Sequence, residues 1–498
     1  MLTLPPEIIN NAFSFLPTPL APYAGVSKQW QGLIERRTFS EVHLTTARLP
    51  DFQRIVGPSR YSIVRQIQFI TILPEYEIAA RSKFEGDEDR ERNNQAFSMA
   101  ISSLFHALHS WPDRSQVTLT IFAQSPSDWY AEPDKEKRMK RYNMGNLWGR
   151  DLLDHRYERS YLQWSAQDMP SVNAVVALNI IGEGDWRRIA PAAVARIACR
   201  LPRLRKIDCM LCDNERKDLV LRDSLRDEFA LSLRDWPASI EHLHLEYRCD
   251  PPLNENKIPP RRSEAGKDAL CLALHRLSHQ LVTLELEEIT IGPELFWPPG
   301  TQKNSPPQWP KLTRLMVTYM SATPSGQWLF ERDPRCPIWN QEDEPTFEEI
   351  AEGQFDHYVP AREDYPVDRF RSKPLPLMNE IYKAAGLAAQ HMPLLEDMAM
   401  AAQIQGTIIE VRQGSAEHLF RYTRETARVK WVGMSEFHPT KEVMDIWKGV
   451  GREHGLDRVQ VESIGLDHLP ALFSYDLDDD FFDKYRTEEH GYVLWDTS

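Results

Sequence analysis

The sequence predicts an α/β protein, with a short helical unit at the N-terminus followed by a solenoid of parallel strands that alternate with helices. Three observations support this prediction. The first forty residues carry helical patterns punctuated by prolines, short apolar strand patterns recur behind a bulky residue and a proline, and the intervals between them hold one helix each. The chain of 498 residues also exceeds the size of one compact core, which stops growing at about 250–300 residues.

The opening residues predict three short helices. Pro5 and Pro6 stand where a helix can begin, because the first turn does not use its amide donors, and Pro17 and Pro19 end the apolar face that follows. Ser27 is placed to cap a later helix. Three helices in such a short segment cannot bury this much apolar surface by themselves. Their apolar side chains therefore require a partner.

This N-terminal pattern resembles an F-box over residues 2–45. The resemblance rests on Leu-Pro-x-Glu-Ile at the start, a leucine after the first helix, and Val-Ser-Lys-x-Trp near the end. It implies that the segment binds a Skp-type adaptor and, through the adaptor, a cullin. The positions that match the family's adaptor-binding residues are Leu4, Pro5, Ile8, Leu16, Leu20, Val26 and Trp30. The alternative is a helical cap that covers the first open edge of the repeat array.

The body of the chain repeats a strand pattern behind a proline. Trp236-Pro237 precedes Ile240-x-x-Leu243-x-Leu245, and Trp309-Pro310 precedes Leu312-x-x-Leu315-x-Val317. The patterns that start at residues 175, 204, 240, 281 and 312 are about 30–40 residues apart, enough for one strand and one helix. Helical patterns fill the intervals at 191–200, 223–233 and 267–277. Such a unit cannot close its own core, so we expect neighbouring units to stack with all strands parallel.

This array resembles an irregular leucine-rich-repeat solenoid, with possible first strands at 39–44 and 64–69. An ordinary α/β domain with a parallel sheet is the alternative. Near the C-terminus the pattern becomes strand, helix and strand at 428–432, 440–453 and 459–461, which we expect to cap the array. The predicted domains are an F-box at 1–45, a repeat body with long insertions at 46–415 and a C-terminal cap at 416–498. This organisation resembles a group of filamentous-fungal F-box proteins.

One long insertion, residues 331–377, combines prolines with aromatic residues. Loops longer than about 15 residues are usually functional or disordered, and disordered linkers contain few aromatic residues. We therefore expect this insertion to pack on the body and to present a recognition surface for a protein substrate. The candidate substrate-binding residues are Trp339, Phe347, Phe355, Tyr358 and Tyr365.

Composition argues against several other classes of protein. The formal net charge of -14 repels a phosphate backbone, so nucleic acid is not an expected partner. The 6 cysteines are too sparse for a disulfide framework, and no apolar run reaches the roughly 18 residues of a membrane span. The N-terminus lacks the basic lead of a secretory signal. We expect a cytoplasmic or nuclear protein.

The motifs that suggest small-molecule or metal chemistry are incomplete. Gly182-Glu-Gly184 follows a strand, but Arg187 occupies the third glycine position of a dinucleotide fingerprint. Cys209 and Cys212 would point to opposite faces of one strand, whereas His242 and His244 share a face without further metal ligands. We expect no cofactor.

Together these patterns predict a non-catalytic receptor: the substrate-recognition subunit of an SCF-type cullin-RING ubiquitin ligase. The N-terminal helices would bind the adaptor, and the repeat body would bind a protein substrate. Two alternatives remain open at this point. One is an adaptor-bound scaffold that acts outside a ligase, and the other is an enzyme with an unrecognised site in residues 175–498.

Overall fold

A computed structural model describes most of the chain. The described residues are 5–17, 20–77, 80, 83–129, 156–157, 159–165, 169–182, 186–212, 219–248, 258–302, 304–332, 371–403, 418–433, 437–456 and 458–465.

A 12-stranded, mostly parallel sheet forms the centre of this α/β structure, with strand order β1-β2-β3-β4-β5-β6-β7-β8-β11-β12-β13-β14. Strands that follow one another in the chain therefore lie side by side. The strands are β1 (Glu41–Thr45), β2 (Gln66–Ile72), β3 (Val117–Gln124), β4 (Val175–Ile181), β5 (Lys206–Cys212), β6 (His242–Arg248), β7 (Thr283–Ile289), β8 (Arg314–Met320), β11 (Asp397–Gln403), β12 (His418–Thr423), β13 (Arg428–Gly433) and β14 (Gln460–Gly465). The strand patterns predicted from the sequence are confirmed along the whole array.

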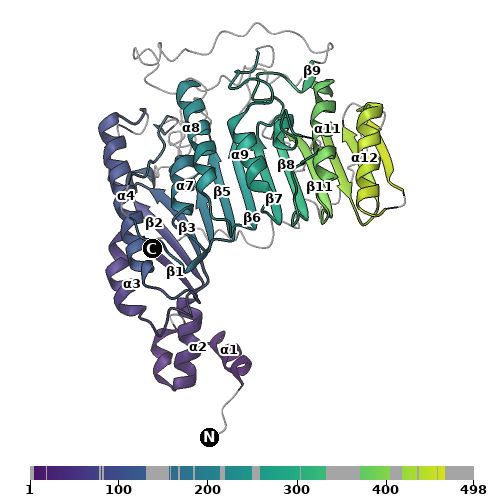
Figure 1. Cartoon of the computed structure of the whole chain (residues 1–498). Helices are drawn as coiled ribbons and strands as arrows, with labels where there is room; N and C mark the ends of the chain where they lie inside the picture. The colour runs from purple at the N-terminus through teal and green to yellow at the C-terminus, as the bar shows by residue number, and fades with distance from the viewer. Residues whose placement is uncertain are drawn as a thin grey trace, which may run out of the picture.

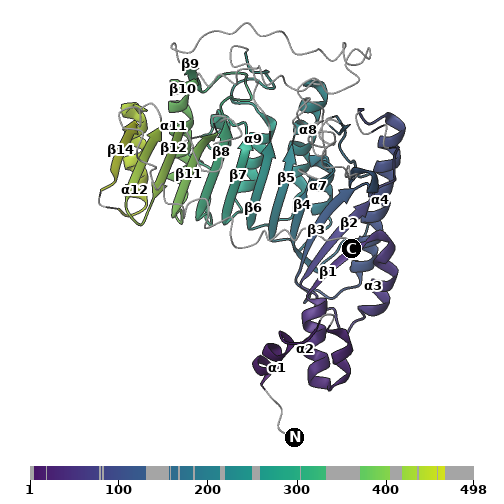
Figure 2. The same cartoon turned by 180° about the vertical axis from the view of Figure 1, so that it is seen from behind.

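The helices that follow these strands cover one face of the sheet (Figure 1), and the view from behind shows the strands of the other face uncovered by any described helix (Figure 2). The helices are α3 (Leu49–Ile55), α4 (Asp87–His109), α7 (Pro191–Ala198), α8 (Leu219–Ser232), α9 (Ala269–Ser278), α11 (Leu377–Ala389) and α12 (Lys441–Glu453). The helices predicted at 191–200, 223–233 and 267–277 are confirmed as α7, α8 and α9. We call the uncovered side the open face.

The repeated apolar motif explains how successive units lock together. Ile207 of β5 pairs in register with Leu243 of β6, which pairs with Leu284 of β7 and then with Leu315 of β8. These side chains point to the helix side and are buried. Burial of one such side chain stabilises the fold by about 1.5–3 kcal/mol. Because each row crosses several units, the main core is continuous from β1 to β14.

The expectation that all strands run parallel is wrong at two places. β12 pairs antiparallel with both β11 and β13, and β9 (Phe330–Arg332) pairs antiparallel with β10 (Arg371–Pro374). β12 and β13 are joined by a four-residue turn that Ala427 closes with a positive φ of 49° and a bond from its amide to the Arg424 carbonyl. A turn this short joins only antiparallel strands, whereas a parallel pair needs a crossover of about a dozen residues.

The N-terminal helical unit, residues 5–39, has a small core of its own. It contains α1 (Pro6–Phe13), the 3-10 helix η1 (Ala21–Gly25) and α2 (Lys28–Phe39). Ile9, Phe13 and Ile34 form this core, which is separate from the main one. The predicted cap is confirmed, because Ser27 Oγ accepts a bond from the Trp30 amide at 3.1 Å. In Figures 1 and 2 the unit extends beyond the β1 end of the sheet.

The C-terminal strand, helix and strand predicted from the sequence are confirmed as β13, α12 and β14. Trp447 of α12 is fully buried and donates its Nε1 hydrogen to the Tyr382 carbonyl of α11 at 3.1 Å. The sheet continues through the β11–β12 pair on both sides of the proposed boundary at 415. The domain boundaries at 45 and 415 stay predictions. Within the described residues, no helix combines the length and the apolar character that crossing a membrane requires.

Candidate functional site

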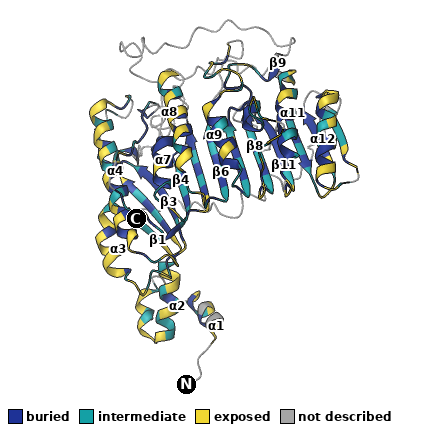
Figure 3. Ribbon diagram, viewed as in Figure 1, coloured by how far each residue is buried: buried dark blue, intermediate teal, exposed yellow. Residues whose placement is uncertain are grey.

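The N-terminal helical unit exposes large apolar side chains around its small core. Ile8, Phe15 and Val26 are 57%, 81% and 61% exposed. Figure 3 shows most of α2 in the colours of exposed and intermediate residues. Trp30 is half-buried and packs its ring edge-on against Phe13, with the centroids 5.1 Å apart. Exposed apolar side chains that cluster on one small unit are typical of a protein interaction surface.

The structure places the candidate adaptor-binding residues unevenly. Pro5, Ile8 and Val26 are exposed, while Leu16, Leu20 and Trp30 are half-buried against the small core. Leu4 lies outside the described residues. Sequence reasoning missed Phe15, the most exposed large apolar side chain of the unit. The position of Phe15 in the sequence could have indicated its exposure. It lies between α1 and the half-buried Leu16, in a segment too short to bury both side chains.

The candidate substrate-binding residues cannot be placed in the same way. Trp339, Phe347, Phe355, Tyr358 and Tyr365 all lie outside the described residues. The part of the body that the structure describes offers a different surface, the open face.

The middle of the open face carries charged side chains that pair across strands. His244 of β6 lies between two carboxylates, with Nδ1 at 2.9 Å from Asp208 of β5 and Nε2 at 3.4 Å from Glu287 of β7. Farther along, Arg421 of β12 forms a two-pronged pair with Asp397 of β11 at 3.1 and 3.3 Å. These ladders hold neighbouring strands in register on a face that no described helix covers.

An apolar row lies beside these charges on β2 to β5. On the open face, Ile70 of β2 pairs in register with Phe122 of β3, and Ile181 of β4 pairs with Met210 of β5; Phe122 and Ile181 directly follow the paired residues Ile121 and Ile180. Trp186 packs on Phe122 with the ring centroids 4.6 Å apart, and Ile70, Ile181 and Met210 are half-buried. A partner strand or loop that covered this row would remove more apolar surface from water.

Protonation of His244 has a measurable consequence. Burial alone lowers the pKa of this imidazole, but hydrogen bonds to Asp208 and Glu287 outweigh burial and raise the pKa to about 10. The resulting stabilisation is fully present below the unfolded pKa of about 6.5 and is lost as the pH rises through 10. We predict that His244→Gln lowers the free energy of unfolding by about 1–2 kcal/mol near pH 6, with the difference shrinking towards pH 10.

Urea denaturation of both proteins across this pH range measures the effect. His242→Gln is the matched control, because His242 lies on the same strand face and bonds to the Thr283 hydroxyl at 3.0 Å instead of a carboxylate. A constant difference between wild type and His244→Gln at every pH would contradict the assignment.

A buried polar cluster lies where β2, β3 and β4 end. Glu85 accepts two bonds from Arg187, at 3.0 and 3.1 Å, and one from Asn93 at 2.5 Å. Asp128 accepts one bond each from the Tyr76 and Tyr157 hydroxyls, both at 2.7 Å. This edge of a parallel sheet is where α/β proteins commonly bind ligands.

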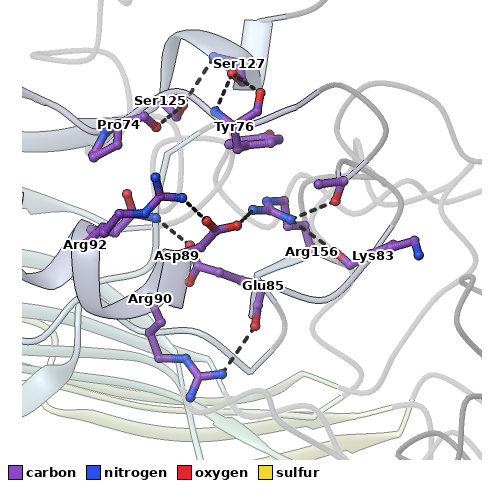
Figure 4. Close-up of polar contacts among 12 residues, drawn as sticks. Pro74, Tyr76, Lys83, Glu85, Asp89, Arg90, Arg92, Ser125, Ser127 and Arg156 are labelled. Carbon is purple, nitrogen blue, oxygen red and sulfur yellow. Dashed lines mark hydrogen bonds and ion pairs between the residues drawn. The ribbon is translucent and has the colours of Figure 1, made fainter. Parts of the chain in front are cut away.

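Arg156 joins this cluster to the start of α4 (Figure 4). It donates to Asp89 at 2.8 Å and to the Ala80 carbonyl at 2.7 Å, while its guanidinium stacks 3.9 Å over the Tyr76 ring. Burial opposes ionisation of Asp89, but hydrogen bonds from Arg92 and Arg156 outweigh burial and lower the pKa of this carboxyl. These contacts attach the described residues of three loops to one another, namely 74–77, 80 and 83–86 of the first, 125–129 of the second, and 156–157 and 159–164 of the third.

A second buried ion pair lies at the same edge near β6 and β7. Arg226 of α8 donates to both oxygens of Asp268, at 3.0 and 2.8 Å, and to the Thr290 carbonyl at 3.1 Å. Asp268 also caps α9 by accepting the Cys271 amide at 2.8 Å. Glu294 bonds to the Asp268 amide, and burial raises the pKa of the Glu294 carboxyl.

The polar groups of these buried clusters contact other groups of the same chain. Asp89, Glu85 and Asp268 each pair with an arginine, while Asp128 accepts from two tyrosine hydroxyls and Glu294 accepts from the Asp268 amide. A cavity among the described residues, next to Trp309 and Met392, has a volume of about 10 Å³. Such a cavity holds about one water molecule. Arg187, which replaces the third glycine of the dinucleotide fingerprint, forms a buried ion pair with Glu85. Sequence reasoning missed both ion pairs, because their partners are far apart in the chain.

The candidate metal motifs form no metal site in the described part of the chain. Cys209 and Cys212 are buried thiols that form no disulfide, and the ring nitrogens of His244 are occupied by carboxylates. No group of three or more potential ligands is positioned to hold an ion among the described residues.

Comparison with known proteins adds one finding. Residues 371–469 match a family of unknown function, DUF6546. This region contains α11, β11, β12, β13, α12 and β14, the part of the sheet where the antiparallel strand β12 is inserted. Neither an F-box nor a leucine-rich-repeat family model is among the matches. A search of curated proteins found no match.

Proposed function

We propose that this protein is a non-catalytic substrate receptor of an SCF-type cullin-RING ubiquitin ligase. In this proposal the N-terminal helical unit is an F-box that binds a Skp-type adaptor, and the body is an irregular leucine-rich-repeat-like solenoid that binds a protein substrate. Catalysis is then a matter of proximity, because the receptor raises the local concentration of a substrate lysine near the conjugating enzyme.

The observation that carries the proposal is the incomplete burial of the N-terminal helical unit. Its core consists of Ile9, Phe13 and Ile34, while Ile8, Phe15 and Val26 remain exposed. Exposed side chains at the positions that match an adaptor-binding surface are expected if a second polypeptide completes the core. A helical cap on the repeat array would instead turn its apolar side chains towards β1, which is contrary to the separate core of this unit.

The arrangement of the body supports the second half of the proposal. Sequential strand order and helices on one side of the sheet are typical of a solenoid, whereas a doubly wound domain has helices on both faces. The open face is then available to a protein partner. Its apolar row from Ile70 to Met210 and its paired charges form a surface of mixed character, as protein interfaces commonly are.

Affinity purification tests the proposal. Wild-type protein is expected to copurify with the adaptor and the cullin, whereas a Leu4→Ala, Pro5→Ala, Ile8→Ala variant should lose both. Removal of one anchor side chain from an interface typically costs about 2 kcal/mol or more of binding free energy. The loss of even one anchor should therefore weaken adaptor binding by at least about 30-fold. Thermal unfolding of the body should remain unchanged, because Pro5 and Ile8 are exposed and do not belong to the main core.

A matched control removes three exposed apolar side chains from the body. Met99, Val220 and Leu231 are 64%, 78% and 59% exposed on α4 and α8, and their replacement by alanine should leave copurification intact. Adaptor retained by the N-terminal variant would overturn the F-box assignment. Adaptor without cullin in the wild-type sample would indicate a scaffold outside a ligase.

A further inference from the structure

The N-terminal helical unit is joined to the sheet by one helix that contributes to both cores. On α2, Ile34 belongs to the small core, whereas Phe39 packs against the main core. The two residues are separated by about 7.5 Å along the helix axis. In Figures 1 and 2, α1 lies away from the sheet in both views. The orientation of the whole unit therefore depends on how the end of α2 is held.

Backbone hydrogen bonds hold the end of α2. The carbonyl of Ser40, the residue after α2, accepts bonds from the amides of Arg65 at 2.8 Å and Gln66 at 2.9 Å. These bonds attach the end of the helix to the start of β2. A helix that is held near its end can still tilt about that point, so a contact farther along α2 constrains its angle.

Arg60 supplies this second contact from the turn between α3 and β2. Its Nη2 donates to Glu35 Oε1 at 2.7 Å and its Nε donates to Oε2 at 3.3 Å. Its Nη1 donates to the carbonyl of Ile55, the last residue of α3, at 2.6 Å. The guanidinium also lies over the Phe39 ring, with Cζ 5.2 Å from the centroid. One side chain thus braces α2 against the end of α3.

The chemistry of this brace favours a defined orientation. A planar guanidinium that grips a carboxylate with two donors restricts the angle between the groups as well as their distance. Hydrogen bonds from Arg60 and Gln31 lower the pKa of Glu35, so the carboxylate stays charged near neutral pH. The two side chains are 29% and 20% exposed, and a pair this accessible contributes little to the free energy of unfolding.

We propose that Arg60 is a positioning residue that fixes the angle between the N-terminal helical unit and the sheet. This role of Arg60 follows from the contacts of its side chain, whereas the consequence for substrate placement rests on the proposed function. For a receptor that binds the adaptor at one end and a substrate on the sheet, this angle sets where the substrate lies relative to the conjugating enzyme. Proximity catalysis is sensitive to such placement.

Distance measurement between two spin labels tests the proposal. One label is attached to Asn11→Cys on α1 and the other to Met99→Cys on α4, both at exposed positions. Labels are confined to these sites by replacing Cys199, Cys249 and Cys336 with serine, because Cys209, Cys212 and Cys271 are buried. Pulsed electron paramagnetic resonance then reports the distribution of distances between the unit and the body.

The full-length protein is expected to give one narrow distribution, and Arg60→Ala is expected to widen it by about twofold or more, as a released hinge does. Glu35→Ala should also widen it, and the double variant should widen it no more than Arg60→Ala alone, because Arg60→Ala already removes the contact with Glu35. Arg54→Ala is the matched control, since Arg54 lies on α3 and, within the described part of the chain, forms its ion pair with the helix neighbour Asp51. A distribution that stays narrow in Arg60→Ala would overturn the proposal.

Adaptor binding, measured on the same variants, separates this inference from the proposed function. Arg60→Ala should bind the adaptor as the wild type does, because Arg60 lies outside the exposed apolar surface of Ile8, Phe15 and Val26. If no variant and no wild-type protein binds an adaptor, the proposed function fails while the distance distributions still decide the role of Arg60. Far-ultraviolet circular dichroism on each variant confirms that the comparison is made between folded proteins. Arg60→Lys keeps the charge but loses the two-donor contact with Glu35, so it should also widen the distance distribution.

Discussion

Replacing Arg187 by methionine is expected to lower the free energy of unfolding by about 3–5 kcal/mol, because the change leaves Glu85 buried without its counter-charge. The two side chains are 1% and 0% exposed. Arg187 also donates to the Ser160 hydroxyl at 3.1 Å and stacks 3.7 Å over the Tyr157 ring, so the variant loses its contacts to this loop as well. The loops at the ends of β2, β3 and β4 should detach before the rest of the sheet unfolds.

Urea denaturation measures the overall loss, and hydrogen exchange of residues 84–86 and 156–164 measures the local one. The double variant Arg187→Met, Glu85→Gln should recover part of the stability, because no unpaired charge then remains in the interior. Arg54→Ala serves as the comparison for an exposed pair, with an expected change below about 1 kcal/mol. If Arg187→Met and Arg54→Ala lowered the free energy of unfolding by similar amounts, the prediction that loss of the buried pair costs more than loss of the exposed pair would be wrong.

The second large effect is expected at Asp268. Its replacement by alanine should lower the free energy of unfolding by about 3–5 kcal/mol, because it leaves the guanidinium of Arg226 buried without its carboxylate and also removes the cap of α9. Asp268→Asn should lose less, because the amide oxygen can still accept the Cys271 amide.

The pH dependence of stability distinguishes the two losses at Asp268. Burial opposes ionisation of Asp268, but the Arg226 charge and its hydrogen bonds outweigh burial and lower the pKa of this carboxyl. Its stabilisation is therefore present above the unfolded pKa of about 3.9 and is lost as the pH falls through the folded value. Wild type should lose stability in this acidic range, and both variants should lose less. Equal acid sensitivity of all three proteins would contradict the ion pair as the cause.

Much of the fold followed from local patterns. Each strand predicted from the apolar motif is present, as are the helices behind Pro191 and around Leu270, because a period of two or of 3.6 residues shows in the sequence which face is buried. The antiparallel strand β12 was missed. Its direction depends on the short turn closed by Ala427, and no nearby apolar period reports the direction of a strand.

The site was predictable to a lesser degree. The exposed positions Ile8 and Val26 were named from a motif, whereas Phe15 was recognised only when its exposure was known. The brace between Glu35 and Arg60 joins residues 25 positions apart, and the pair between Glu85 and Arg187 joins residues 102 positions apart. Sequence spacing does not report such contacts, because complete helices and strands lie between the partners and only the folded chain brings them together.

The sequence by itself therefore determined the order of helices and strands, the repeated strand rows and the apolar surplus at the N-terminus. These features arise from neighbouring residues, whose period and turn chemistry act over a few positions. Only the tertiary structure decided the separation of the small core from the main one, the open face of the sheet and the pairing of buried charges. These features depend on which distant surfaces meet, and burial of an ion pair is favourable only where folding brings both partners together.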